Sequence, residues 1–416
     1  MKYFTVTLIE KGKRREELLK ANNRMEVVAL AKKRFPLSEV MKATETSAPV
    51  EDKISEFFEE ITKSLRKSTI PMDDKISTIR QIAVMTDAGI PINDTLVEVA
   101  ANTENKNLKE IYTNINNDIN SGNSISDAIK PYAKEFGHIA IAMTNLGEKT
   151  GNFSESYHKL ADVLETIRDN TAKFKKAIRS PLITLAAMGI AFTILIMVVV
   201  PKFKDIFEKF RTELPLPTKI LLNLEWAFSN YGVLILATLF LTIFMIKYLY
   251  KNNLDAKYFM DKLMISPQFY LINKAIFLST MHKYNLVFGE LVKSGIPVAE
   301  ALTTAVGMVD NAVLKEQLLT VNVNIGRGIS LAEALQQTGL YENMLLQMIK
   351  AGEAGGQLDT MLDKVTGYYD MKFQELIDNL SSYIEPILMF FIAGLVLLMA
   401  LGIFMPMWDL GKAVKG

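Results

Sequence analysis

The chain has 416 residues, 49% of them apolar, with a formal net charge of +1 and a mean hydropathy of +0.16. The lack of cysteine excludes disulfides, thiolate metal sites and cysteine nucleophiles, and the near-zero charge gives no support for binding a nucleic acid. Three histidines, His138, His158 and His282, are too few and too scattered to predict a metal or catalytic centre. We expect soluble domains joined to a few membrane-spanning helices.

Residues 1–45 predict a small α/β region. Residues 1–10 alternate as a strand does and lack the long apolar core of a signal peptide, so we expect the N-terminus to stay in the cytoplasm. A basic turn at 11–15 and a helix near 25–35 are expected to follow.

Residues 46–70 are predicted as a linker followed by an amphipathic helix. The polar stretch 42–53 has no periodic pattern, whereas 54–70 places apolar residues on one face of a partly basic helix. The first helical domain is expected over 71–180.

Three stretches are long and apolar enough to cross a bilayer, with a buried core helix as the alternative for each. The expected transmembrane helices are 181–201, 227–247 and 384–407. Basic residues precede the first span and follow the second, which places those flanks in the cytoplasm. The connection 202–226 and the tail 408–416 are then outside, and the second helical domain, 248–383, is inside.

One pattern occurs twice along the chain. Gly89-Ile90-Pro91 returns 206 residues later as Gly295-Ile296-Pro297, and Gly147-Glu148 returns 205 residues later as Gly352-Glu353. This internal repeat covers a helical domain and the span that follows it. The second span has no counterpart, and it returns the chain to the inner side, so that both helical domains face the same compartment.

Each helical domain is predicted to be an antiparallel bundle of about six helices. One buried helix face is formed by Leu108, Ile111, Tyr112, Ile115 and Ile119. Glycines are expected to end helices in the left-handed conformation, and Ser124 and Ser330 to cap the helices that follow. The fold class is therefore an all-α integral membrane protein with two repeated bundles, three transmembrane helices and an N-terminal α/β appendage.

These motifs resemble the type II secretion F family, which includes the PilC platform proteins of type IV pili and relatives in competence systems. The segments that carry the resemblance are Ala88-Gly89-Ile90-Pro91, Ser294-Gly295-Ile296-Pro297, the Gly-Glu-x-x-Gly-x-Leu pattern at 352–358, Glu385-Pro386 and Met405-Pro406-Met407. The first copy departs from the family pattern at Phe153, where leucine is usual, and at Ser180, where glutamate is usual.

The resemblance implies a non-enzymatic platform in the bacterial inner membrane, with the N-terminus and both bundles cytoplasmic and the C-terminus periplasmic. It implies as partners a cytoplasmic hexameric ATPase, pilin or pseudopilin subunits, other inner-membrane assembly proteins, the lipid bilayer and further copies of the chain, without direct contact to nucleic acid. The platform would couple the ATPase to insertion of subunits into a filament, in a secretion, pilus or DNA-uptake machine. Motion would pass through helices at 152–178 and 357–383.

The candidate partner-binding or structural residues lie at the repeated turns and at the edge of the last span: Gly89, Pro91, Gly147, Glu148, Gly151, Gly295, Pro297, Gly352, Glu353, Gly356, Glu385 and Pro386. The acids Glu148 and Glu353 are interpreted as helix-capping groups, as contacts to a partner, or as ligands of a hard cation such as calcium. One acid supplies too few oxygens for a cation, so no metal and no cofactor is predicted. Glu385 is expected to face a neighbouring span or the interface, with a pilin segment as the alternative.

Two features have less specific interpretations. Gly147-Glu148-Lys149-Thr150 lacks the residue order of a phosphate loop and follows a helix where such a loop needs a strand. The basic stretches 62–67 and 173–179 fit contacts to lipid headgroups or to an acidic surface of the ATPase.

Two other functions compete with a platform. A small membrane transporter subunit would need polar residues at the centre of its spans, and these spans contain almost none. A membrane-tethered sensor or enzyme would need an outer domain or a catalytic constellation, and the sequence predicts neither.

Overall fold

The computed structural model describes residues 2–10, 13–21, 24–35, 39–46, 70–199 and 216–413. The chain divides into two compact units, Met1–Thr69 and Ile70–Gly416. The predicted amphipathic helix before residue 70, the basic stretch 62–67 and most of the predicted outer connection, 202–215, lie outside the described residues.

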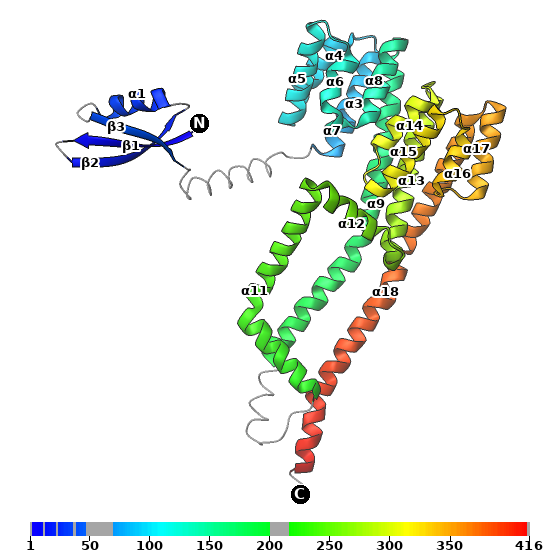
Figure 1. Cartoon of the computed structure of the whole chain (residues 1–416). Coiled ribbons are helices and arrows are strands. Elements are labelled where there is room, and N and C mark those ends of the chain that lie inside the picture. Colours follow the sequence, from blue (N-terminus) through cyan, green and yellow to red (C-terminus); the bar gives the residue numbers. More distant parts are fainter. Residues whose placement is uncertain are drawn as a thin grey trace. The chain divides into compact units, whose positions relative to one another are not determined.

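The N-terminal unit is an antiparallel sheet with one helix packed against it (Figure 1). Strand β1 (Lys2–Glu10) pairs with both β2 (Lys13–Ala21) and β3 (Glu39–Thr46), and α1 (Arg24–Arg34) connects β2 to β3. The core of the unit consists of Phe4, Val6, Val27, Ala31 and Ala43. The predicted small α/β region is confirmed.

Two local predictions in this unit are wrong. Glu10 pairs with Lys13, so residues 13–15, expected in a turn, belong to strand β2. Residues 42–46, expected in a linker, belong to strand β3. Ala43 is buried while Lys42 and Thr44 are exposed. A strand with one small apolar residue among polar ones gives a weak sequence signal.

The first helical bundle consists of α3 to α8 and the beginning of α9. The helices are α3 (Met72–Asp87), α4 (Ile92–Asn102), α5 (Lys106–Asn120), α6 (Ile125–Ile129), α7 (Ala133–Phe136), α8 (His138–Thr150) and α9 (Phe153–Ile194). A 3₁₀ turn (Lys130–Tyr132) precedes α7, and a π-helical turn (Leu195–Val199) follows α9. Within this bundle α3 packs along α9.

The second helical bundle consists of α13 to α17 and the beginning of α18. Two helices precede it, α11 (Leu216–Asn252) and α12 (Leu254–Met264), and a 3₁₀ turn (Pro267–Phe269) joins α12 to the bundle. The bundle helices are α13 (Tyr270–Lys293), α14 (Val298–Gly307), α15 (Ala312–Gly326), α16 (Leu331–Thr338), α17 (Asn343–Gly355) and α18 (Leu358–Ala413). Here α13 packs along α18.

Helices of the two bundles begin at positions separated by the spacing of the sequence pattern. Helices α4, α5 and α6 begin 206 residues before α14, α15 and α16, and α8 and α9 begin 205 residues before α17 and α18. Their starts also use the same chemistry. Asn105 and Asn311 accept backbone N–H groups at the starts of α5 and α15, as Ser124 and Ser330 do at α6 and α16.

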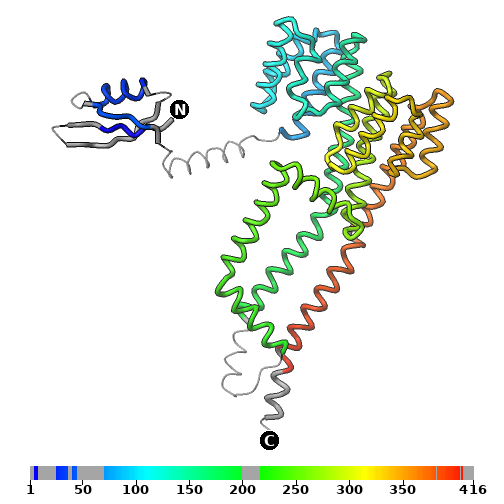
Figure 2. Tube along the Cα trace, in the orientation of Figure 1, coloured from blue at the N-terminus to red at the C-terminus, as the bar shows by residue number. Residues whose placement is uncertain are grey.

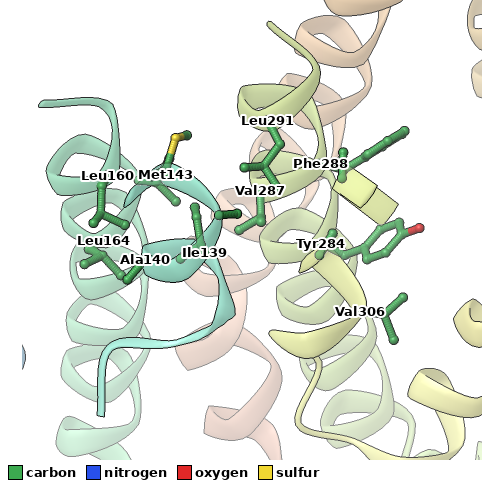
Figure 3. Close-up of a cluster of buried hydrophobic side chains, with 14 of the residues drawn as sticks. Ile139, Ala140, Met143, Leu160, Leu164, Tyr284, Val287, Phe288, Leu291 and Val306 are labelled. Carbon is green, nitrogen blue, oxygen red and sulfur yellow. The ribbon is translucent and has the colours of Figure 1, made fainter. Parts of the chain in front are cut away.

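The hydrophobic core continues from one bundle into the other. Figure 3 shows part of it, with Ile139 and Met143 from α8 near Val287 and Leu291 from α13. All four side chains are buried. The two bundles are therefore packed together along α8 and α13, in addition to the contact between the long helices α9 and α18.

Within the described residues, three helices are long and apolar enough to cross a membrane: α9, α11 and α18. Figure 2 shows α9 and α18 leaving the two bundles as continuous helices. The apolar parts of the three helices expose large side chains, such as Phe390 on α18 (78%) and Val233 on α11 (85%). Water would not stabilise such surfaces, whereas lipid would. Each of these helices contains one of the three stretches predicted as spans, as far as the structure describes it, so the prediction of three apolar helices of membrane length is confirmed.

Two of these helices extend further than predicted. Helix α11 begins at Leu216, so residues 216–226, expected in the outer connection, are helical. Helix α18 continues through residues 408–413, expected in the tail. The start of α11 crosses α18 closely at Gly402, where the Thr218 hydroxyl donates to the Gly402 carbonyl at 2.8 Å. A Cβ on Gly402 would lie 2.4 Å from the Leu221 side chain, so glycine permits this approach.

Candidate functional site

The repeated acid Glu148 caps a helix that is distant in sequence. Its two carboxylate oxygens accept the backbone N–H groups of Ile125 (3.0 Å) and Ser126 (3.2 Å), and one of them also accepts the Ser126 hydroxyl at 2.6 Å. Both N–H groups lie in the first turn of α6, where donors lack partners within the helix and the helix dipole favours negative charge.

Glu353 makes the corresponding contacts in the second bundle. Its carboxylate accepts the N–H groups of Leu331 (2.9 Å) and Ala332 (3.3 Å) at the start of α16. Of the interpretations left open by the sequence, the geometry matches helix capping, here from a neighbouring helix. Among the described residues no group of three or more acidic or histidine side chains is placed to hold a metal ion.

The glycines beside these acids allow close helix packing. A Cβ on Gly147 would lie 2.9 Å from the Phe153 ring and 3.2 Å from the Phe153 backbone. A Cβ on Gly352 would lie 2.7 Å from the Met361 side chain and 3.1 Å from the Gln357 carbonyl oxygen. Glycine therefore lets α8 and α17 reach α9 and α18 closely enough for the acids to cap their targets.

The other turn candidates have backbone roles. Gly89 and Gly295 have φ of +80° and +85°, and Gly151 and Gly356 end α8 and α17 in the left-handed conformation. Pro91 and Pro297 stand just before the first residues of α4 and α14. The stretch Gly147-Glu148-Lys149-Thr150 is the last turn of α8, which confirms that it follows a helix and not a strand.

Glu385 and Pro386 lie inside α18, and both are exposed. Among the described residues no ion pair or hydrogen bond of the Glu385 side chain is found, and its contact to a neighbouring span stays a prediction. The corresponding proline of the first copy, Pro181, lies inside α9 and is buried.

A polar cluster between the bundles was not predicted. The Asn170 amide on α9 donates to His282 Nδ1 on α13 (3.1 Å) and to Asp370 on α18 (3.3 Å), and it accepts from Gln374 (2.8 Å). Because Nδ1 accepts, the neutral ring carries its proton on Nε2, which lies 3.6 Å from Asp370. Burial lowers the pKa of His282, and the Asp370 carboxylate opposes this shift.

A second unpredicted contact joins the end of α11 to the second bundle. The buried carboxylate of Asp261 on α12 accepts the Tyr250 hydroxyl at 2.9 Å and the Ala312 backbone N–H at 2.8 Å. It thereby connects an apolar helix to the first turn of α15. A weak sequence signal was available for the first contact, because His282 stands among the apolar residues Ala275, Leu278 and Met281 of α13. None was available for Asp261, since α12 is a mixed sequence with charged residues on several sides.

These contacts hold helices together and do not assemble reactive groups. The carboxylates of Glu148, Glu353 and Asp261 each accept backbone N–H groups at helix starts, and the Asn170 cluster connects three helices from both bundles. Such joints fix the long helices to the bundles, which is the property a scaffold requires.

Comparisons with known proteins agree with the sequence motifs. A sequence model of the family described as "Type II secretion system (T2SS), protein F" matches residues 78–201 and 286–406, together more than half of the chain. The chain is 27% identical to the type IV pilus assembly protein PilC of Myxococcus xanthus, covering 81% of this chain and 80% of that protein.

Two further relatives cover similar shares. The type IV pilus assembly protein PilC of Pseudomonas aeruginosa is 26% identical, over 84% of this chain and 92% of the relative. The type II secretion system protein F of Vibrio cholerae is 26% identical, over 84% of this chain and 85% of the relative. The resemblance inferred from the motifs is confirmed, and the chain belongs to the type II secretion system protein F family.

Proposed function

We propose that this chain is the inner-membrane platform of a type II secretion or type IV pilus machine. The observation that carries the proposal is the family match to both helical bundles, each together with the apolar helix that continues from it. The relatives bear the names of pilus assembly and secretion system proteins. Family membership and three apolar helices together indicate an inner-membrane protein.

In this proposal the two bundles are copies of one repeated unit. The domains are an N-terminal region, two bundles, three spans, an outer connection and a short outer tail. The equal spacing of helix starts and the matching acid contacts of Glu148 and Glu353 support a repeat. The N-terminus and both bundles face the cytoplasm, and the C-terminus faces the periplasm, as the basic residues beside the first and second spans favour.

The orientation is testable because the chain has no cysteine of its own. Single cysteines at Lys149 and Lys350, both exposed in the bundles, should react with a membrane-impermeant maleimide only after the inner membrane is opened. A cysteine at Thr212, in the outer connection, should react in intact spheroplasts. Labelling of either bundle position in intact spheroplasts would refute the orientation.

The platform couples a cytoplasmic hexameric ATPase to the insertion of pilin or pseudopilin subunits into a filament. Continuous helices support this role: α9 and α18 each run from a bundle into an apolar segment, so a displacement of the bundle moves the span. The Asn170 cluster supports joint movement of both, because it connects α9 to α18.

A pull-down tests this function directly. The tagged chain, solubilised in mild detergent, should co-purify with an assembly ATPase and pilin-like subunits identified by mass spectrometry. Recovery of neither after cross-linking, together with substrate flux in reconstituted vesicles, would replace the platform with a transporter subunit.

A further inference from the structure

Helix α8 of the first bundle occupies a groove between α13 and α14 of the second bundle. The contact is close at one end, where a Cβ on Gly307 would lie 2.5 Å from the His138 ring and one on Gly137 would lie 3.0 Å from the Met308 sulfur. Further along, Ile139 lies on the side of α8 that faces α13 (Figure 3), and it is fully buried.

The corresponding groove on the first bundle, between α3 and α4, is open. It contains a cavity of about 620 Å³ lined by Ser77, Arg80, Gln81, Val84, Met85 and Asn102. Gln81, Met85 and Asn102 stand 206 residues before Val287, Leu291 and Met308, which line the occupied groove. Among the described helices, α3 packs mainly on α4 and α9, so none of them occupies this cavity.

The second bundle correspondingly exposes a helix of the kind that fills such a groove. Helix α17 begins 205 residues after α8, and Met344 takes the position of Ile139. Ile139 is 0% exposed, whereas Met344 is 55% exposed. The next turn of α17 carries Met348 at the position of the buried Met143, and Met348 is half-buried against the core of its own bundle, so Met344 is the side chain that α17 exposes here. As far as the structure describes the chain, one groove thus has no helix in it and one equivalent helix lies in no groove.

At the close end of the contact, the groove residue and the helix residue both differ between the occupied groove and the open one. In the occupied groove, glycine at 307 makes room for the imidazole of His138. In the open groove, the position of Gly307 is Ala101, and the position of His138 on α17 is the smaller Asn343. An added methyl group on the groove is therefore matched by a smaller side chain on the helix, which keeps the combined volume similar.

The polarity of a second pair of residues also differs between the occupied groove and the open one. Gly137 contacts Met308 inside the chain. The corresponding positions are Glu342, just before α17, and Asn102 in the open groove. Within the chain the Glu342 carboxylate accepts the Tyr368 hydroxyl at 2.8 Å, and the Asn102 amide donates to Glu98 at 2.8 Å. Both groups keep free hydrogen-bonding capacity, so a carboxylate and an amide can also pair where the occupied groove has an apolar contact. Both sides of the open pair are thus more polar than the occupied pair, as suits surfaces exposed to water before association.

We propose that α17 of a second copy of this chain fills the groove between α3 and α4. This deepens the proposed platform by naming its homo-oligomer contact, and it rests on that function only for the membrane setting. The contact is heterologous, because helix and groove are different surfaces. Each copy provides one helix and accepts one, so the copies join head to tail into a ring or an open row.

Two single-cysteine variants of the full chain test the contact. Ala101→Cys and Asn343→Cys carry different tags and are co-expressed, and membranes are oxidised with copper phenanthroline. The expected product is a disulfide-linked dimer that contains both tags and is not formed by either variant alone. Self-linked dimers of one variant would indicate a two-fold contact, and no link at all would mean an empty or otherwise occupied groove. Either result overturns the proposal.

The chain provides its own positive control. His138→Cys with Gly307→Cys in one chain places the pair at the occupied groove, where the two Cβ atoms are close enough for an internal disulfide. This variant should shift in mobility without forming a dimer. Thr113→Cys, exposed on α5, replaces Ala101→Cys in the negative control and should give no mixed dimer.

A third variant identifies the occupant of the groove. Met344→Glu should reduce the mixed dimer about tenfold, because it buries an unpaired carboxylate at the contact. An internal link between Ala101→Cys and Ser64→Cys would assign the groove to the chain's own segment before α3 and would refute the second copy. Co-purification of ATPase and pilins is measured on the same membranes. If the mixed dimer forms but ATPase and pilins do not co-purify, the platform function is rejected and the contact between copies stands. If ATPase and pilins co-purify but no mixed dimer forms, only the contact between copies is rejected.

Discussion

In each bundle a glutamate caps an equivalent helix, α6 in the first and α16 in the second, but the two glutamates accept different numbers of hydrogen bonds. Glu148 accepts two backbone N–H groups and the Ser126 hydroxyl, whereas Glu353 accepts two N–H groups and faces Ala332 at the position of Ser126. The shared bonds are those that a helix start requires, and the additional one depends on a single side chain. The two backbone bonds are therefore common to both bundles, and the Ser126 hydroxyl bond is an addition of the first bundle.

The largest expected effect comes from filling the close approach that places each acid. Gly352→Val should destabilise the full chain by about 3 kcal/mol, because the Gln357 carbonyl and the Met361 Cβ leave no space for a side chain. Gly147→Val should act similarly against the Phe153 backbone. The thermal midpoint of the detergent-solubilised chain, followed by size exclusion, measures the loss.

A glycine three residues further along α17 provides the matched control. Gly355 also lies in the helix, but nothing lies within 4 Å of a Cβ built there. Gly355→Val should change the midpoint far less than Gly352→Val. Equal effects of the two substitutions would mean that helix propensity, and not packing against α18, determines the loss.

Removal of the acids should reveal the difference between the bundles. Glu148→Ala should cost about 2 kcal/mol, since charge-assisted bonds to buried donors are among the stronger hydrogen bonds. Glu353→Ala should cost about 1 kcal/mol, because Glu353 is exposed and makes one bond fewer. The same thermal midpoint is measured for both variants.

The double comparison with Ser126→Ala sharpens this result. Removing the Ser126 hydroxyl should bring the first bundle closer to the second, so that Glu148→Ala in that background costs about as much as Glu353→Ala. A larger loss for Glu353→Ala than for Glu148→Ala in the unmodified chain would contradict the role of the additional bond.

Local chemistry predicted much of this fold, and long-range placement did not follow from it. Glycines with positive φ, serine caps and apolar runs act within a few residues, so the turns at Gly89 and Gly295 and the three apolar helices could be predicted. Helix α11 begins earlier than expected because helix formation continues through Lys219 and Glu225, which interrupt the apolar run but not the helix.

The targets of the repeated acids could not be predicted for a different reason. Glu148 was a candidate from its position, but its partners lie 22 and 23 residues earlier in the chain, at the start of another helix. Their contact depends on how α8 packs against α6, and no local pattern encodes that packing. The Asn170 cluster is more distant still, since it joins three helices from both bundles.

The repeated turns should respond equally in the two bundles. Gly89→Val and Gly295→Val should each cost about 1–2 kcal/mol, because a β-branched side chain is strained at a positive φ even where no atom blocks it. Asparagine tolerates this conformation, so Gly295→Asn should cost less than Gly295→Val. A loss for only one bundle, measured by the thermal midpoint, would show that its turn has a further contact.

The smallest expected effect distinguishes the joint between the bundles from the bundles themselves. His282 takes the position that Ile76 occupies in the first bundle, so only the second bundle places a titratable group there. Because burial lowers the pKa of His282, the unfolded chain binds its proton more readily than the folded chain. The contribution to stability is fully present above the ordinary histidine pKa of about 6.5 and decreases as the pH falls below it. The thermal midpoint should therefore fall from pH 7.5 to pH 5.5, and His282→Gln should reduce that slope. A slope that His282→Gln leaves unchanged would remove the cluster of Asn170, His282 and Asp370 as its origin.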